Sequence, residues 1–115
     1  KNEYGEQNLR GFNNIKGYIE NNIYDEFCLD KLSKMANINK FGFVKKFKVS
    51  TGMTPMNYIL MKKIFSCKNS IDPNSVLTEI AYQYNFTDMA HFSKTFKRYI
   101  GVSPKMYQEN LIEIV

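Results

Sequence analysis

The sequence predicts an all-α protein of about seven helices, arranged as two helix-turn-helix subdomains joined by a linker helix. Apolar residues recur at helical spacing along most of the 115 residues. No segment keeps the alternation of apolar and polar residues that is typical of strands. A duplicated pattern also divides the chain into two similar parts. The hydrophobic fraction of 43%, with 15% aromatic residues, is enough to build a packed core.

One pattern of aromatic, glycine and proline residues occurs twice. Its first copy is Phe43-x-x-x-Phe47-Lys48-x-x-x-Gly52-x-x-Pro55-x-x-Tyr58. The second copy lies 49 positions further along, as Phe92-x-x-x-Phe96-Lys97-x-x-x-Gly101-x-x-Pro104-x-x-Tyr107. Upstream the offset is 48, because Leu32 matches Ile80, Asn37 matches Asn85 and Ile38 matches Phe86. The chain therefore contains a duplicated unit, and its second copy holds one extra residue between Phe86 and Phe92.

Each copy is predicted to begin with a helix that ends in a short turn. An opening helix precedes the first copy and is marked by Phe12, Ile15, Ile19 and Ile23. The first helix of the first copy is marked by Leu29, Leu32, Met35 and Ala36. Asp30 suits the N-terminal end of that helix because its charge complements the helix dipole. Asn37 and Asn85 follow the first helices, where asparagine tolerates the left-handed backbone that ends many helices.

The second helix of each copy is expected to carry a cap at both ends. Asn39 can cap the N-terminus in the first copy, and either Thr87 or Asp88 can do so in the second. The pairs Phe43/Phe47 and Phe92/Phe96 are spaced i, i+4 and are expected to face the core. Gly52 and Gly101 are expected to stop these helices.

New helices are expected where a cap residue precedes proline, at Thr54-Pro55 and Ser103-Pro104. The middle helix then runs from Pro55 to about Ser70 and is marked by Leu60, Ile64, Cys67 and Ile71. The closing helix is marked by Tyr107, Leu111 and Ile114. Asp72-Pro73-Asn74-Ser75 is the clearest loop. The predicted organisation is a linker at 1–8, a first subdomain at 9–54, a linker helix at 55–71 and a second subdomain at 72–115.

Positive charge is concentrated in two blocks of the chain. The net charge is +5, yet residues 1–30 carry more acids than bases. From Lys31 to Ile71 there are nine lysines and no acid, and from Met89 to Gln108 there are four bases and no acid. Solvated faces usually mix both signs. Segregated blocks favour a surface that binds a polyanion.

The two cysteines, Cys28 and Cys67, form no CxxC motif and lie among apolar residues. We expect buried free thiols at both positions, and neither a disulfide nor a metal site. No apolar run approaches the roughly 20 residues that span a bilayer, and no signal peptide is recognisable. These features favour a cytoplasmic protein without a membrane partner.

A helix-turn-helix inserts its second helix into the major groove of B-DNA, so that helix must be apolar inward and basic or polar outward. Both copies meet this requirement, because basic residues surround each phenylalanine pair. A middle helix of about 15 residues is roughly 22 Å long. With the widths of the flanking units, this length approaches the roughly 34 Å per turn that separates major grooves on one face of DNA.

The second copy carries a longer motif, Ile80-Ala81-x-x-Tyr84-x-Phe86-x-Asp88-x-x-x-Phe92-Ser93-x-x-Phe96-Lys97-x-x-x-Gly101-x-Ser103-Pro104-x-x-Tyr107. The first copy shares Leu29-x-x-Leu32, Phe47-Lys48-x-x-Thr51-Gly52 and Pro55-x-x-Tyr58. Residues from about Leu29 to Gln108 resemble the DNA-binding domain of the AraC/XylS family of bacterial transcription regulators. The resemblance implies a nucleoid-associated protein whose two recognition helices enter successive major-groove segments of double-stranded DNA. It also implies contact with RNA polymerase and a separate N-terminal regulatory domain.

The resemblance also indicates which positions face DNA. The base-reading candidates are Lys40, Phe41, Val44, Lys45, Met89, Ala90, His91 and Lys94. The candidates for contact with the DNA backbone are Asn39, Lys46, Lys48, Lys97 and Arg98. Gly42 and Val44 cannot form a bidentate base contact, whereas Phe41 and Val44 can touch a thymine methyl group. Lys94 suits guanine, and His91 can pack, touch phosphate or read a base.

The chain departs from the family pattern at several positions. Ser33 stands where the family commonly has alanine, asparagine replaces the usual turn glycine in both copies, and Lys63 stands where arginine is frequent. We expect the fold to tolerate these changes. The more consequential departure is on the second helix of the first copy, at Lys40, Phe41, Gly42, Val44 and Lys45. We expect these residues chiefly to contact the DNA backbone or to make apolar contacts with bases.

Other functions remain as alternatives. We expect no catalytic residue, metal or cofactor, because one histidine stands without HExxH, a Walker loop or GxGxxG. A helical protein-interaction module is the stronger rival, with Phe41, Val44 and Met89 as its patch. RNA binding is less favoured, since no aromatic stacking platform is recognisable.

Overall fold

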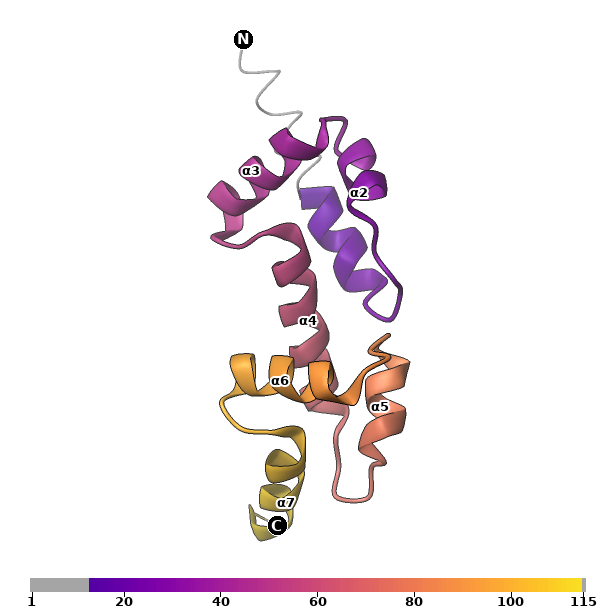
Figure 1. Cartoon of the computed structure of the whole chain (residues 1–115), viewed down its shortest axis with the longest axis vertical. Coiled ribbons are helices and arrows are strands. Elements are labelled where there is room, and N and C mark those ends of the chain that lie inside the picture. The colour runs from indigo at the N-terminus through magenta and orange to yellow at the C-terminus, as the bar shows by residue number, and fades with distance from the viewer. Residues whose placement is uncertain (1–12, 115) are drawn as a thin grey trace. The chain divides into compact units, whose positions relative to one another are not determined.

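The computed structural model describes the backbone of residues 13–114 and the side chains of residues 13–111 (Figure 1). Within that range the chain forms seven helices and no strand, which confirms the all-α prediction. The chain divides into two compact units, Lys1–Ile59 and Leu60–Val115. The expected linker at 1–8 and Phe12 lie outside the described residues.

The first unit begins with a helical segment at residues 13–21, followed by α2 (Leu29–Met35) and α3 (Lys40–Thr51). Ile15 and Ile19 are buried as the sequence predicts. Ile23 is also buried, but it lies in the turn after the opening helix. The helix α4 (Pro55–Ser70) starts in this unit, with Pro55 at its first position, and the division between the units falls within it.

The second unit contains the rest of α4 together with α5 (Leu77–Gln83), α6 (Met89–Ile100) and α7 (Pro104–Ile114). Its loop at residues 72–75 is closed by local hydrogen bonds, among them Ser75 N–H to the Asp72 carbonyl at 3.1 Å. The side-chain amide of Gln108 on α7 donates to the carbonyls of Asp72 at 3.0 Å and Ser75 at 2.8 Å. This contact holds the loop against α7.

The buried Tyr84 joins α5 to α4 within the second unit. Its hydroxyl lies 3.0 Å from the Ser66 hydroxyl and 2.9 Å from the Ser70 hydroxyl. A buried hydroxyl without a partner would cost free energy, and the two serines remove that cost. The phenolic end of Tyr84 therefore fixes α5 against the C-terminal part of α4 within the second unit.

The duplicated pattern corresponds to a duplicated aromatic core. In the first unit the ring centroids lie 5.6 Å apart for Phe43 and Phe47, and 5.1 Å apart for Phe47 and Tyr58. The equivalent second-unit distances are 5.9 Å for Phe92 and Phe96, and 5.8 Å for Phe96 and Tyr107. All four phenylalanines are fully buried, as the i, i+4 spacing predicts.

The turns between the paired helices also match. Asn37 has φ 62° and Asn85 has φ 72°, which confirms the left-handed backbone predicted for both. Gly52 and Gly101 end the second helices with φ 80° and 102°. Thr54 and Ser103 cap the helices that follow, accepting from the N–H groups of Asn57 at 3.3 Å and Met106 at 3.1 Å.

The structure decides which residue caps α6. Asp88 Oδ1 accepts from the N–H of Ala90 at 2.9 Å and from that of His91 at 3.4 Å. In the first unit Asn39 Oδ1 accepts from Gly42 N–H at 2.7 Å. Since Asn39 follows Ile38 directly whereas Asp88 stands two positions after Phe86, the extra residue of the second copy is Thr87.

Asp88→Ala is therefore expected to lower the free energy of unfolding by about 1 kcal/mol, because two N–H groups lose their acceptor. Urea unfolding followed by circular dichroism measures the change. Thr87→Ala is the matched control and should change the stability little. A loss from Thr87→Ala as large as that from Asp88→Ala would contradict the assignment of the cap.

The prediction for the cysteines is half wrong. Both are free thiols, but only Cys67 is buried. Burial raises the pKa of the Cys67 thiol to about 12, so this thiol stays protonated at neutral pH. Cys28 is exposed because it occupies the N-cap of α2, where an extended backbone (φ −121°, ψ 128°) leads into the helix. Apolar neighbours in the sequence do not bury a residue at such a helix end.

Candidate nucleic-acid interface

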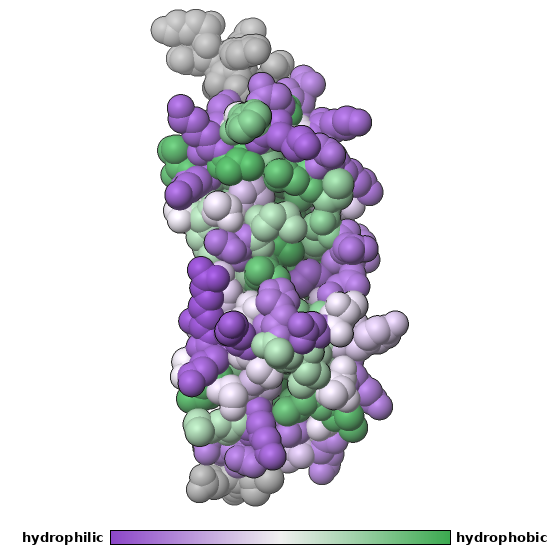
Figure 2. Space-filling model, in the orientation of Figure 1, coloured by the Kyte–Doolittle hydropathy of each residue, from purple (hydrophilic) through white to green (hydrophobic). Residues whose placement is uncertain are grey.

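The second helix of each unit has an aromatic inner face and a basic outer face. On α3 the inner residues Phe43 and Phe47 are fully buried, whereas Lys45, Lys46 and Lys48 are exposed. On α6 the buried residues are Phe92, Thr95 and Phe96. The exposed basic residues on α6 are His91, Lys94, Lys97 and Arg98. On the face shown in Figure 2, hydrophilic side chains cover much of the surface, with apolar patches between them.

Nearly all the candidate residues predicted from the sequence are exposed. On α3 and at its cap the exposed candidates are Asn39, Lys40, Phe41, Lys45, Lys46 and Lys48, and Val44 is half-buried. On α6 they are Met89, Ala90, His91, Lys94, Lys97 and Arg98. A side chain must be accessible at the surface to contact DNA. Each unit meets this requirement with its own set of candidate DNA-contacting residues on its second helix.

The two helices can be compared position by position, because α3 and α6 both have 12 residues and start 49 positions apart. Lys45 is then equivalent to Lys94, and Lys48 to Lys97. Phe41 is equivalent to Ala90, Gly42 to His91 and Val44 to Ser93. The helices therefore share two lysines, whereas their first three residues differ, with Lys40 equivalent to Met89 at the start. A side chain at Gly42 would be crowded, since a Cβ there would lie 3.3 Å from Asn39 Oδ1.

Lys40 is held by an ion pair that sequence patterns did not reveal. Its ammonium lies 2.8 Å from a carboxylate oxygen of Asp30 on α2, and both side chains are more than half exposed. The Lys40 ammonium lowers the pKa of the Asp30 carboxyl through its hydrogen bond and charge, and Asp30 raises the pKa of Lys40 in return. An exposed pair is weak. Lys40 must exchange this partner before it can contact a phosphate or a base.

His91 and Arg98 contact neighbouring aromatic rings. The ring of His91 lies 5.6 Å from that of Phe86, and the backbone carbonyl of His91 accepts from the Thr95 hydroxyl at 2.7 Å. The Arg98 guanidinium lies 5.5 Å from the centroid of the Tyr99 ring. These contacts restrict both side chains while leaving them exposed at the surface.

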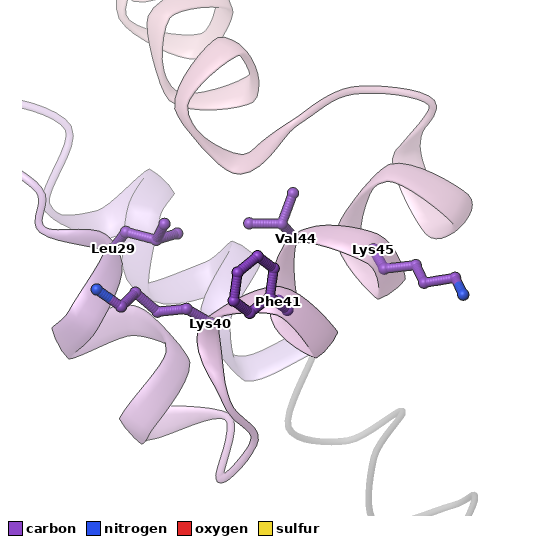
Figure 3. Close-up of a pocket in the computed structure, with 5 residues that line it drawn as sticks. All are labelled: Leu29, Lys40, Phe41, Val44 and Lys45. Carbon is purple, nitrogen blue, oxygen red and sulfur yellow. The ribbon is translucent and has the colours of Figure 1, made fainter.

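An apolar depression of about 630 Å³ lies at the start of α3 (Figure 3). It is lined by Leu29, Lys40, Phe41, Val44 and Lys45. Phe41 and Val44 stand on α3 and Leu29 on α2, while the amino groups of Lys40 and Lys45 extend in opposite directions. Phe41 is 89% exposed, which is unusual for so large an apolar side chain. The sequence had indicated the apolar character of this face but not the depression.

Metal-binding clusters and membrane-spanning helices were looked for in the part of the chain that the structure describes. No cluster of three or more histidine, cysteine or acidic residues is arranged to hold a metal ion there. None of the helices in that part has the length and apolar character needed to cross a membrane.

Two bihelical units, each with a capped second helix that is basic on its outer face, define the chain as a tandem helix-turn-helix module. Comparison with known families agrees, since a helix-turn-helix domain family matches residues 32–110. The chain belongs to this family of helix-turn-helix domains, of the AraC/XylS type found in bacterial DNA-binding transcription regulators.

Curated relatives are identical to this chain at about a quarter to a third of the aligned positions. The MmsAB operon regulatory protein of Pseudomonas aeruginosa is 26% identical over 98 residues, which are 84% of this chain and 32% of that protein. The probable transcriptional regulator LumQ of Photobacterium leiognathi is 32% identical over 95 residues, which are 82% of this chain and 38% of LumQ. The match thus spans only about a third of the length of either relative.

Solved structures share the fold. The C-terminal domain of the response regulator yesN from Fusobacterium nucleatum has a TM-score of 0.76 and 28% identity, covering 86% of this chain and 98% of that one. A probable AraC family transcriptional regulator from Rhodopseudomonas palustris has a TM-score of 0.81 and 22% identity, covering 89% and 97%. The DNA-binding domain of AdpA, solved in complex with a target DNA, has a TM-score of 0.77 and 17% identity, covering 84% and 88%.

Proposed function

We propose that the chain binds double-stranded DNA sequence-specifically through two recognition helices, α3 and α6, which enter successive major-groove segments and thereby regulate transcription. The observation that carries the proposal is the repeated geometry of these helices. In each unit fully buried phenylalanines fix the inner face, so the exposed lysines of the outer face have a defined position. The second helix of a helix-turn-helix enters the major groove in this way.

The proposal assigns roles by position along the helices. Base edges are read by residues in the N-terminal halves of the two helices, namely Lys40, Phe41, Val44, Lys45, Met89, Ala90, His91 and Lys94. The DNA backbone is contacted by Asn39, Lys46, Lys48, Lys97 and Arg98. Asn39 contributes through the exposed start of α3, where its side chain accepts from Gly42 N–H. No catalytic role, metal or cofactor is assigned.

The wider setting of the proposal comes from the family. We propose that the chain acts in the cytoplasm at the nucleoid, contacts RNA polymerase and works with a separate regulatory domain. The chain covers 32% of the MmsAB regulator and 38% of LumQ, so these relatives contain further polypeptide beside the matched region. Tethering two recognition units in one chain raises the effective concentration of the second, so one copy of the module suffices for binding.

The salt dependence of binding tests the proposal against its rival, a module that binds another protein through an apolar patch. Four exposed cations, Lys46, Lys48, Lys97 and Arg98, are assigned to phosphates. Neutralising about four phosphates predicts that the DNA affinity falls roughly 100-fold between 50 and 200 mM salt. Fluorescence anisotropy with a labelled duplex measures this dependence. If no binding to DNA is detected at low salt, the proposal is wrong.

The rival function rests on one specific observation, the exposure of Phe41 beside the apolar depression. An apolar protein contact depends little on salt. If α3 served only such a contact, Lys46→Ala and Lys48→Ala would leave DNA binding unchanged. The DNA-binding proposal expects each of these variants to weaken it.

A further inference from the structure

The two recognition helices offer different chemistry to a base pair. The helices begin with Lys40 and Met89. At the next positions that differ, α3 has Phe41, Gly42 and Val44, whereas α6 has Ala90, His91 and Ser93. The α3 set contains no side-chain hydrogen-bond donor or acceptor. The α6 set contains an imidazole and a hydroxyl. A polar base edge can therefore find partners on α6 at positions where α3 offers only apolar surface.

Phe41 is an exposed apolar side chain beside the half-buried Val44 and Leu29. Phe41 is 89% exposed, so it contributes little to the packing of the first unit. Phe41, Val44 and Leu29 line the open depression at the start of α3, and Lys40 and Lys45 flank it (Figure 3). An exposed apolar patch of this kind, rimmed by charged side chains, is typical of a binding surface.

The charge around the patch favours DNA as its occupant. Between Lys31 and Ile71 the chain has nine lysines and no acid, and four of these lysines are on α3 itself. Asp30 lies just outside this stretch, and its carboxylate is paired with Lys40. A major groove that contains thymine has phosphates along its edges and methyl groups on its floor. An apolar patch surrounded by lysines is complementary to both.

We infer that the first unit reads thymine through its C5 methyl group, with Phe41 and Val44 in contact with methyl groups in the major groove. This inference rests on the proposed DNA-binding function and adds the base class that α3 selects. Thymine alone among the four bases presents a methyl group there. A guanine, adenine or cytosine edge against the phenyl ring would lose water without gaining a hydrogen bond, so the same ring also disfavours those bases.

Replacing thymine by uracil tests the inference, because uracil keeps the hydrogen-bonding groups and lacks only the methyl group. The whole chain first selects duplexes from a random pool. One selected duplex is then synthesised with deoxyuridine in either half of its site. In the half contacted by α3, each lost methyl contact should weaken binding about fourfold. Deoxyuridine in the other half should have a smaller effect. Fluorescence anisotropy gives both dissociation constants.

Phe41→Ala links the effect to the residue and makes position 41 the same as its equivalent, Ala90. The variant should bind the thymine duplex about tenfold more weakly and should lose the distinction between thymine and uracil in that half. Val49→Ala is the matched control. Val49 is also on α3 and is 82% exposed, but it does not line the depression. It should keep both the affinity and the distinction.

Each outcome separates the inference from the function on which it rests. If the pool yields no enriched duplex, both fall. If duplexes are enriched but Phe41→Ala distinguishes thymine from uracil as well as the parent chain does, the function stands and the inference is wrong. If Phe41→Ala leaves the affinity for the thymine duplex unchanged, the depression binds another partner, such as a protein, and the inference is again wrong.

Discussion

Phe96→Ala is expected to lower the free energy of unfolding by about 3–5 kcal/mol, because it removes a large ring from the core of the second unit. Phe96 is fully buried on α6, and its ring lies 5.9 Å from that of Phe92 and 5.8 Å from that of Tyr107. Removal of the ring loses the burial of its apolar surface and leaves a cavity between α6 and α7. A domain of this size has a total stability of only about 5–15 kcal/mol, so the second unit would be close to unfolding.

Urea unfolding followed by circular dichroism measures this loss, and two substitutions serve as comparisons. Phe47→Ala removes the equivalent ring of the first unit and should be similarly costly. Phe41→Ala removes the same kind of side chain from an 89% exposed position and should change the stability by less than about 0.5 kcal/mol. A small loss for Phe96→Ala, similar to that for Phe41→Ala, would show that the aromatic pairs do not form the core.

Lys94→Ala is expected to weaken binding selectively, by roughly 5-fold to 150-fold on a selected duplex and far less on a random one, as for the loss of one good base contact. Lys94 is exposed and is the sixth of the 12 residues of α6, four positions before Arg98 and three before Lys97. The N-terminal part of a recognition helix reaches base edges, whereas phosphates are met further along. The change should be largest at one segment of the site.

Lys48→Ala is the comparison for Lys94→Ala, since Lys48 is assigned to the DNA backbone. Its loss should weaken binding to all duplexes alike and reduce the slope of log affinity against log salt by about 1. Anisotropy titrations of both variants on selected and random duplexes at several salt concentrations measure these effects. Equal losses on both duplexes for Lys94→Ala would remove Lys94 from the base-reading residues.

Most of the fold could be predicted because its signals are local. The phenylalanine pairs and the helix caps depend on residues within a few positions of one another, and the repeat shows the same local signals twice. Asn37 and Asn85 were expected to adopt a left-handed backbone, and both do. The remaining choice between Thr87 and Asp88 concerned two adjacent residues with similar capping ability. Only the backbone geometry at the turn selects Asp88.

The parts that could not be predicted depend on contacts between helices. Lys40 and Asp30 are ten positions apart, and their ion pair forms only because α2 and α3 meet. The depression beside Phe41 likewise needs Leu29 from α2. Cys28 was expected to be buried because of its apolar neighbours, yet its place at the start of α2 exposes it. The spacing of residues within one helix does not indicate which residues of a second helix will contact it.

The candidate site falls between these cases. Helical spacing was enough to predict that basic residues surround each phenylalanine pair, and the exposure of Lys45, Lys48, Lys94 and Lys97 agrees with it. Which of these side chains contacts a base and which a phosphate depends on the distance of each from the DNA. That assignment therefore remains a prediction, and the substitutions above are designed to test it.

Selection of bound duplexes from a random pool, with the whole chain as the bait, tests the central claim most directly. The claim is that two copies of one bihelical unit engage DNA together. It predicts that the enriched duplexes carry two preferred segments whose centres lie about 10–10.5 base pairs apart, the repeat of the major groove on one face. Enrichment of a single segment, or two segments at variable spacing, would contradict it.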